Sequence, residues 1–241
     1  MPAIGKSIAA AALVAGGALA LVATGALSAR PDPGGAVAAL APTLAEKGMR
    51  AGMPVFVRIF KEEAELEVWL DTGAAYELFR IYPICAHSGV LGPKLAEGDR
   101  QAPEGFYFVT ERALNPNSRY HLSFDLGFPN AYDRARGRTG SWLMVHGACV
   151  SIGCYAMTDA GIEEIYGLAE AALDAGQPFF RVHAFPFRMT ETNMARHVGS
   201  EWTDFWTNLQ AGYAFFEETR RPPNVTVRDE RYHFETTETP T

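Results

Sequence analysis

The first regular pattern of the chain begins at residue 55 and has a period of two. Over 55–60 and again over 65–70, every second residue is Val, Ile or Leu, and a similar apolar segment covers Tyr76–Ile84. Turn residues separate these segments at 61–64 and at Asp71-Thr72-Gly73. Alternation with a period of two indicates β-strands, and short turns favour antiparallel neighbours. We therefore predict three strands in a meander.

More strands and two helices are predicted after residue 105. Apolar residues at helical spacing predict a helix that starts after Thr158 or Asp159 and ends before Gly176. A second helix over Glu201–Thr219, with Ser200 as its cap, carries an aromatic stripe typical of core packing. The additional strands are Phe106–Thr110, Tyr120–Phe124, Trp142–His146, Phe179–Ala184 and a short pair within Val225–Phe234. Together these elements predict a mainly β fold with attached helices, of the α+β class.

The N-terminal 29 residues carry an export pattern. Lys6 precedes an uncharged apolar run of 21 residues, Ser7–Leu27, close to the roughly 20 residues that a membrane-spanning helix needs. A cleaved signal peptide and a retained membrane anchor both remain open, and either places the rest of the chain outside the cytoplasm. A buried core helix is disfavoured because the run has no amphipathic pattern. Residues 30–51, rich in Pro and Gly, are predicted to be a linker with one short helix around Val37–Glu46.

Composition limits the number of domains and the class of partner. With 241 residues and 48% hydrophobic positions, the chain is long enough for one substantial core, and we predict one main domain. The formal net charge is −7, and no basic stripe is visible. This balance argues against a nucleic-acid partner.

The candidate chemistry lies in the stretch from Ser141 to Asp159. A short strand ends at His146, and Cys154 follows eight positions later. Gly153 permits a tight turn, so the backbone N–H groups of Gly153 and Cys154 are predicted to converge as an oxyanion hole. A cysteine attacks as a thiolate, and an adjacent imidazole can take its proton. This arrangement predicts acyl transfer with Cys154 as nucleophile and His146 as base and then acid.

The same stretch resembles a known family. His-Gly at 146–147, followed after a short loop by SIGC at 151–154, is similar to the signature of YkuD-type L,D-transpeptidases, which remodel peptidoglycan through a catalytic cysteine. The segments LGPKLAEGDRQAPEGFYFV, NPNSRYHLSFDLGFPNAYDRARGRTGS, AMTDAGIEEIY and HAFPFRMT resemble the YafK-like branch of that family. Ala156 stands where many members have Arg, and Ile152 stands where many members have His or Arg. The substrate contacts of the better-known branch are therefore not transferred to this chain.

This resemblance, which covers about residues 52–234, implies a domain organisation and a reaction. It implies a catalytic domain over 52–190, a C-terminal extension over 191–235 packed on it, and a tail at 236–241. Cys154 would attack the diaminopimelate carbonyl of a peptidoglycan stem peptide, and an amine or water would resolve the thioester, without a cofactor. The YafK-like branch favours hydrolysis, which would release a wall-linked lipoprotein or a stem residue. The alternative from another class is a non-catalytic cell-wall binding module with a structural Cys/His pair.

The other cysteines leave two alternatives open. Cys85 ends a strand and is predicted to be a buried thiol, but in an oxidising compartment a Cys85 to Cys149 disulfide that leaves Cys154 free is the second interpretation. A zinc site formed by His146, Cys149, Cys154 and His121 is disfavoured, because their spacing matches no standard zinc pattern. We therefore predict no metal.

Several further residues are candidates for binding the substrate. Arg188 is a candidate cation for a substrate carboxylate, and the alternative is that it fixes the C-terminal extension. His121 is expected beside the cleft on the basis of the resemblance, although an ordinary hydrogen-bonded histidine is the more frequent case for it and for His183. The proposed substrate-binding set is Arg188, His121, Ser151 and Tyr132, with Arg134 and Arg138 as cleft or loop residues.

Overall fold

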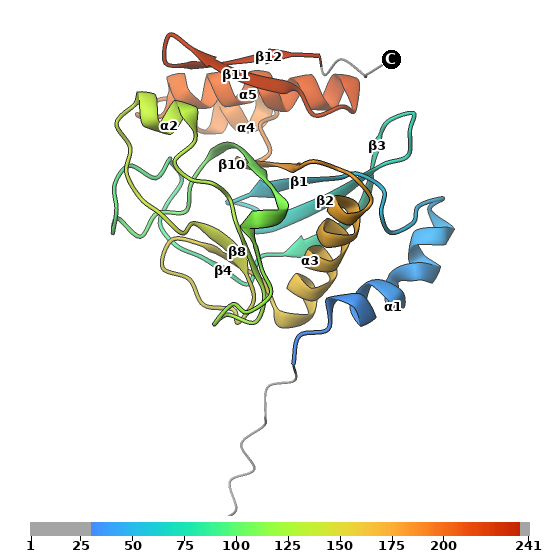
Figure 1. Cartoon of the computed structure of the whole chain (residues 1–241). Coiled ribbons are helices and arrows are strands. Elements are labelled where there is room, and N and C mark those ends of the chain that lie inside the picture. The colour runs from blue at the N-terminus through green and yellow to red at the C-terminus, as the bar shows by residue number, and fades with distance from the viewer. Residues whose placement is uncertain (1–29, 237–241) are drawn as a thin grey trace, which may run out of the picture.

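A five-stranded sheet forms the middle layer of the molecule. The computed structural model describes residues 30–236, and Figure 1 shows their arrangement. The sheet has the order β3-β2-β1-β10-β5. Its strands are β1 (Val55–Phe60), β2 (Glu65–Asp71), β3 (Tyr76–Pro83), β5 (Gly105–Val109) and β10 (Phe180–Phe185). β1, β2 and β3 pair antiparallel in succession, which confirms the predicted meander, and β10 lies parallel to β1.

A second five-stranded sheet is made of shorter strands in the order β4-β9-β8-β7-β6. They are β4 (Ala86–His87), β6 (Leu114–Asn115), β7 (Ser123–Asp125), β8 (Met144–His146) and β9 (Tyr155–Ala156). β8 pairs antiparallel with β7 and parallel with β9. His146 is thus the last residue of its strand, as predicted, although the strand starts two residues later than Trp142.

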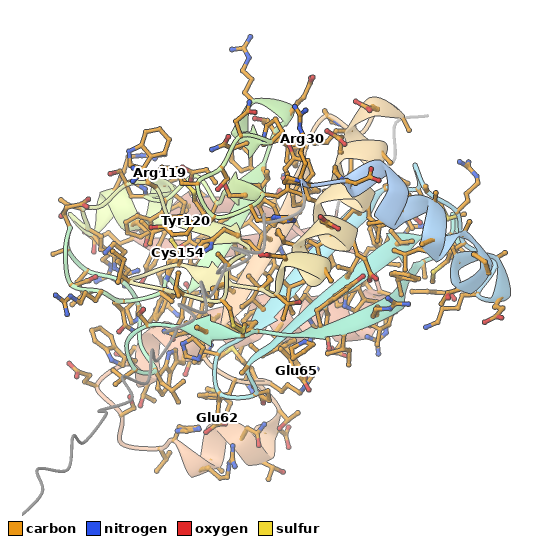
Figure 2. All side chains as sticks on the ribbon, turned by 90° about the horizontal axis from the view of Figure 1, so that it is seen from below. Arg30, Glu62, Glu65, Arg119, Tyr120 and Cys154 are labelled. Atoms are coloured by element: carbon orange, nitrogen blue, oxygen red, sulfur yellow. A yellow bond between two sulfur atoms is a disulfide. The ribbon has the colours of Figure 1, made fainter. Side chains whose placement is uncertain are left out.

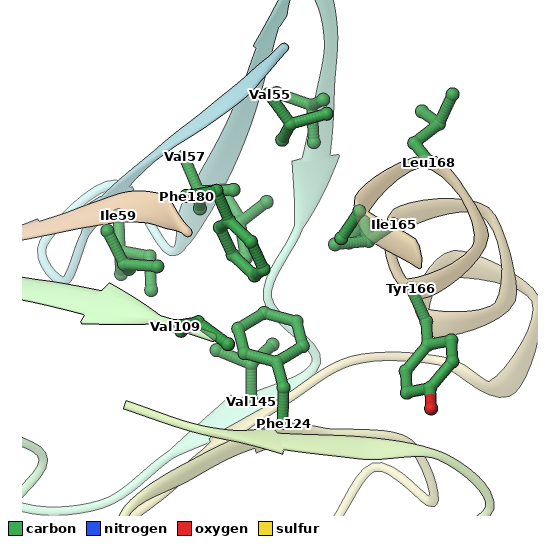
Figure 3. Packing of buried hydrophobic residues seen from close by; sticks show 14 of the residues in the cluster. Val55, Val57, Ile59, Val109, Phe124, Val145, Ile165, Tyr166, Leu168 and Phe180 are labelled. Carbon is green, nitrogen blue, oxygen red and sulfur yellow. The ribbon is translucent and has the colours of Figure 1, made fainter. Parts of the chain in front are cut away.

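The main core fills the space between the two sheets and helix α3 (Asp159–Asp174). Strand alternation directs Val57 and Ile59 of β1 into this space. Figure 3 shows them facing Phe124 and Val145 of the second sheet, with Ile165 of α3 nearby. Sheets and helices in one core make this an α+β protein, which confirms the predicted fold class.

The outer face of the first sheet is covered by the C-terminal extension (Figure 1). The extension consists of α4 (Glu191–Arg196), α5 (Thr203–Thr219), β11 (Asn224–Arg228) and β12 (Arg231–Glu235). The aromatic stripe of α5 packs with Phe60, Phe106 and Phe185 of the sheet, as its spacing predicted. The helix begins later than expected, because Trp202 occupies the cap position and the Ser200 hydroxyl accepts from the Trp202 N–H instead.

Helix α1 (Pro33–Glu46) lies in the segment for which the sequence predicts a linker with a short helix. Asp32 caps it by accepting from the Gly35 N–H, so the helix starts four residues before the expected Val37. Leu40 and Leu44 are buried, and α1 packs against α3. The close approach requires Gly167 in α3, since a Cβ there would lie 2.6 Å from the Pro33 carbonyl oxygen.

Short elements that the sequence did not predict connect the sheets. They are α2 (Ala131–Ala135) and a 3₁₀ turn (Glu111–Ala113). In addition, β7 begins at Ser123, and His121, which was predicted to lie on this strand, has a φ of 70° before it. Over residues 30–236 no helix combines the length and apolar character that crossing a bilayer requires. The apolar run Ser7–Leu27 lies outside the described residues, so its export role remains a prediction.

Candidate active site

One face of the second sheet gathers the candidate residues. The register pairs Phe124 with Val145 and Val145 with Tyr155, and all three side chains enter the core. Their neighbours along each strand therefore point to the opposite face, which is the site face. One row across it contains Ser123, His146 and Ala156, and the adjacent row contains Asp125 and Met144, with Cys154 directly before β9. Cys154 and His146 thus share one face of neighbouring strands.

Cys154 is the free thiol of the described chain and is partly buried. Its sulfur accepts from the Met144 N–H at 3.5 Å and donates to the Trp142 carbonyl at 3.6 Å. Burial raises the pKa of the thiol, and the nearby Asp125 raises it further, whereas the Met144 N–H and Lys94 lower it. The resting group is therefore a neutral thiol at neutral pH.

His146 is held in one orientation and one tautomer. Its side chain is 2% exposed, and Nδ1 lies 2.6 Å from the Gly147 carbonyl oxygen. A carbonyl only accepts, so Nδ1 carries the hydrogen in this bond and the lone pair of the neutral ring is on Nε2. Burial lowers the His146 pKa, and the Tyr120 ring packs 4.7 Å from the imidazole. A neutral, oriented imidazole of this kind is suited to accept a proton.

The loop before Cys154 is organised by Ser151. The N–H groups of Gly153 and Cys154, expected to form an oxyanion hole, both donate to Ser151 Oγ, at 3.2 and 3.0 Å. Ser151 Oγ in turn donates to the Cys154 carbonyl at 2.7 Å and lies 3.0 Å from Ser88 Oγ. The two N–H groups do converge on one point, but in this structure the Ser151 hydroxyl occupies it. Ser151 is therefore in contact with the nucleophile loop.

The disulfide alternative for the other two cysteines is the one observed. Cys85 and Cys149 are bonded, with Cα atoms 5.2 Å apart, so the prediction of a buried Cys85 thiol is wrong. The prediction failed because Cys85 lies on the exposed edge beside β9, where its N–H donates to the Ala156 carbonyl. Cys149 is consequently excluded both as a competing nucleophile and as a thiolate ligand of zinc. Within residues 30–236 no group of three or more His, Cys, Asp or Glu side chains is placed to hold a metal.

The His121 ring contacts two carboxylates of helix α3. Its Nε2 lies 2.7 Å from Glu163 Oε1, and its Nδ1 lies 3.9 Å from Asp159 Oδ2. Asp159 also accepts from the Ala148 N–H at 2.7 Å. Asp159 thus links His121 to the segment after His146, and the role of His121 in substrate binding stays a prediction.

Arg188 and Tyr132 lie away from Cys154. Arg188 pairs with Glu67 at 2.6 Å and with Glu65 at 2.5 Å, and its guanidinium lies over the Phe60 ring. Glu65 is far from Cys154 in Figure 2, across the strands of the first sheet. Two carboxylates of β2 therefore hold Arg188 away from Cys154. Tyr132 is buried, stacked on the rings of Phe205 and Tyr232, and Arg138 is buried in a pair with Asp133.

A cleft of about 810 Å³ lies on the site face next to Cys154. Two residues that line the cleft contact the thiol directly: Met144 through its backbone N–H and Trp142 through its carbonyl. Sequence reasoning missed the carboxylate there, because the predicted strand ended at Phe124, one residue before Asp125. Extending the alternation by one position would have found it. The polar and charged residues that line the cleft are Thr110, Arg112, Asn115, Ser123, Asp125, Arg134 and Ser141.

Comparison with known protein families gives a match to YkuD, the L,D-transpeptidase catalytic domain, over residues 56–183. The chain is also 52% identical over 181 residues to a protein named putative L,D-transpeptidase YafK from Escherichia coli K12. That similarity covers 75% of this chain and 74% of the relative. Both matches include the segment from β8 to β9 that holds His146 and Cys154.

Solved structures with a similar fold have lower sequence identity. The helical cell shape determining protein Pgp2 of Campylobacter jejuni, as its K307A mutant, matches with 20% identity and a TM-score of 0.47, over 70% of this chain and 61% of that one. Bd1075 of Bdellovibrio bacteriovorus matches with 17% identity and a TM-score of 0.39, over 76% of this chain and 85% of that one.

Proposed function

We propose the following reaction for this chain, which belongs to the YkuD family of L,D-transpeptidase catalytic domains. The protein is an acyl transferase of the L,D-transpeptidase type that acts on peptidoglycan stem peptides. Its nucleophile is Cys154, and its acceptor is an amine or water. One observation carries this proposal: the free thiol of Cys154 lies on the same sheet face as His146, whose tautomer is fixed by the Gly147 carbonyl.

The first step transfers the thiol proton to His146 Nε2 as sulfur attacks the carbonyl carbon of the diaminopimelate residue. The thiol hydrogen, which points to the Trp142 carbonyl at rest, must rotate away from it for this transfer. Collapse of the tetrahedral intermediate breaks the carbon–nitrogen bond, and the imidazolium returns its proton to the leaving amine. The product of this step is a thioester on Cys154 and a free amine.

The second step resolves the thioester. An amine or a water molecule attacks the thioester carbonyl while His146 removes its proton, and the thiol leaves with that proton restored. Because both acceptors use the same intermediate, residue types do not distinguish transfer from hydrolysis. We favour hydrolysis, which would release a wall-linked lipoprotein or a stem residue, on the basis of the sequence resemblance to the YafK-like branch.

The oxyanion of each tetrahedral intermediate would be bound by the N–H groups of Gly153 and Cys154. These groups already converge, and they would exchange the Ser151 hydroxyl for the developing negative charge. Charge-assisted hydrogen bonds are roughly twice as strong as neutral ones, so this exchange favours the transition state.

The cleft supports recognition of the free end of diaminopimelate, which carries one ammonium and one carboxylate. Asp125, whose one hydrogen bond to described residues is from the Gly127 N–H, is placed to accept from the ammonium. Arg112 and Arg134 line the same cleft and are placed to bind the carboxylate. This recognition explains how a protein with a net charge of −7 binds an anionic polymer through a few local cations.

The proposed location follows from the substrate. Peptidoglycan lies outside the cytoplasmic membrane, and the apolar run Ser7–Leu27 supports export, either as a cleaved signal or as an anchor. Contact with the membrane would then involve only that N-terminal segment.

The test is the mass of the intact protein after incubation with a stem peptide or a carbapenem. An adduct that maps to the peptide with Cys154 is expected, and it should be absent from Cys154→Ala. His146→Ala should slow adduct formation by about 10²–10⁴-fold, the usual contribution of a general base. Wall binding without any adduct, unchanged in Cys154→Ala, would instead indicate the non-catalytic binding module.

A further inference from the structure

A second cavity lies on the outer face of the first sheet, apart from the thiol. It has a volume of about 230 Å³ and is lined by residues of β5, β10 and the hairpin β11–β12, and Figure 1 shows that hairpin at the top of the view. Strand alternation places Arg181 and His183 of β10 on this outer face, since Phe180, Val182 and Ala184 enter the main core. The cavity and the cleft are therefore on different sheets.

His183 is buried and lacks any hydrogen-bond partner among the described residues. Its side chain is 1% exposed, and neither Nδ1 nor Nε2 is paired. The rings of Phe56 and Phe106 pack at 4.6 and 4.7 Å and offer it no acceptor. An unpaired buried polar group is destabilising, so a hydrogen-bond partner inside the cavity would stabilise the fold.

Arg181 is a half-buried cation without a carboxylate partner. Its guanidinium lies over the Phe179 ring, and it makes no hydrogen bond or salt bridge with any residue in 30–236. Burial lowers its pKa, whereas Arg58, a buried arginine on the same outer face, is paired with Glu67 and Glu217. Two groups that can donate hydrogen bonds therefore face one cavity from the same strand.

The cavity contains no acid to balance this charge. Its polar lining among the described residues consists of Tyr107, Asn130, Arg181, His183, Asn224 and Tyr232. Asn130 is already committed to the Phe106 carbonyl and the Tyr232 hydroxyl. In a protein with a net charge of −7, a cavity with a lone guanidinium and no carboxylate favours an anion.

We infer that this cavity binds one carboxylate group, which accepts from the Arg181 guanidinium and from the His183 ring N–H. The volume of 230 Å³ is below the roughly 300–1,000 Å³ of pockets that enclose a drug-sized ligand. The ligand is therefore either a small free carboxylic acid or the carboxylate end of a longer wall fragment. Phe108 lines both this cavity and the cleft, so a wall fragment can span the two. The inference does not depend on the acyl-transfer chemistry.

The experiment measures binding to the full-length protein, with acetate and a wall tetrapeptide as separate probes. Acetate is added to the protein in increasing amounts, and chloride at equal ionic strength is the control. The readouts are the thermal unfolding midpoint of the protein and the ¹⁵N chemical shifts of the His183 ring. The tetrapeptide is added in increasing amounts to the Cys154→Ala variant, which binds the peptide without converting it. A saturable acetate response indicates the small acid, and a response to the tetrapeptide alone indicates the wall fragment.

Variants decide whether the response comes from this cavity. Arg181→Gln should weaken binding at least tenfold, His183→Phe should remove it, and Arg196→Gln, an exposed arginine elsewhere, should leave it unchanged. Arg181→Gln should still form the Cys154 adduct with a carbapenem, which does not reach this cavity, at the wild-type rate, and this separates the inference from the proposed function. The Arg181 side chain is half-buried and unpaired, so its variant tests the site even where His183→Phe fails to fold. Equal responses in wild type and Arg181→Gln, or none to either probe, would overturn the inference.

Discussion

Ser151 and Cys154 are joined by two reciprocal hydrogen bonds. The Cys154 N–H donates to Ser151 Oγ at 3.0 Å, and Ser151 Oγ donates to the Cys154 carbonyl at 2.7 Å. The Gly153 N–H donates to the same hydroxyl. One side chain therefore sets the direction of both N–H groups that are proposed to bind the oxyanion, while it also occupies the point where they converge.

The first prediction concerns this hydroxyl. Ser151→Ala should slow formation of the Cys154 adduct about tenfold or more, because the turn loses the bonds that orient its N–H groups. Ser151→Thr keeps the hydroxyl and should retain most of the rate. The measurement is the rate of adduct formation by intact mass. Faster acylation in Ser151→Ala would show that the hydroxyl only blocks the oxyanion site.

The second prediction concerns pH. Burial raises the Cys154 pKa and lowers the His146 pKa, so both groups are neutral between the two values and no thiolate–imidazolium pair is present at rest. Alkylation by iodoacetamide should therefore rise about tenfold per pH unit through neutral pH, following the thiolate fraction. Cys154→Ala gives the background rate. A plateau of reactivity between pH 5 and 7 would contradict this, since it is the mark of a preformed ion pair.

Sequence patterns predicted the elements that depend on local periodicity. The meander β1–β3 and helix α3 with its Thr158 cap follow from alternation, helical spacing and a capping residue, all of which can be read within one segment. Cys154 and His146 also lie within one short stretch, and β8 and β9 bring them to one face.

Features that depend on distant segments were not predictable in the same way. Arg188 meets Glu65 and Glu67 across more than a hundred residues, and the alternation of β2 alone does not show which cation will face those carboxylates. The backbone of His121 has positive φ, which is uncommon for residues other than glycine and has no sequence signal here. Asp125 was missed because strand ends are the least certain part of any such prediction.

The third prediction concerns Arg188. Arg188→Ala should lower the free energy of unfolding by about 1–3 kcal/mol, because it removes the hydrogen-bond partner of Glu67 Oε1 in a carboxylate that is buried and keeps only Arg58 and Trp69. Arg196→Ala, which breaks an exposed pair with Glu62, is the matched control and should cost less than about 1 kcal/mol. Chemical denaturation measures both. The rate of adduct formation per folded molecule should stay unchanged. A loss of turnover without a loss of stability would instead indicate that Arg188 binds the substrate.

The fourth prediction concerns the disulfide. The double variant Cys85→Ala/Cys149→Ala opens a link across 64 positions, and the loop-entropy estimate for such a link is up to about 4 kcal/mol of stability. The folded fraction should still form the adduct, because the nucleophile is Cys154. Unfolding with and without reductant provides the check: reductant should destabilise the wild type and leave the double variant unchanged. Loss of the adduct in a well-folded double variant would indicate that Cys149, and not Cys154, is the nucleophile.

The last prediction uses the row that places Asp125 and Cys154 on one face, on either side of Met144. Asp125→Asn removes a charge that raises the Cys154 pKa, so the thiolate fraction should rise and alkylation at neutral pH should become faster, by about two- to fivefold. The same change removes the proposed acceptor for the substrate ammonium, so turnover of a stem peptide should fall about tenfold or more. A purely structural Asp125 would not move the two rates in opposite directions. Acylation by a carbapenem, which lacks the diaminopimelate ammonium, is the control and should follow alkylation; a parallel fall in all three rates would refute a role in substrate recognition.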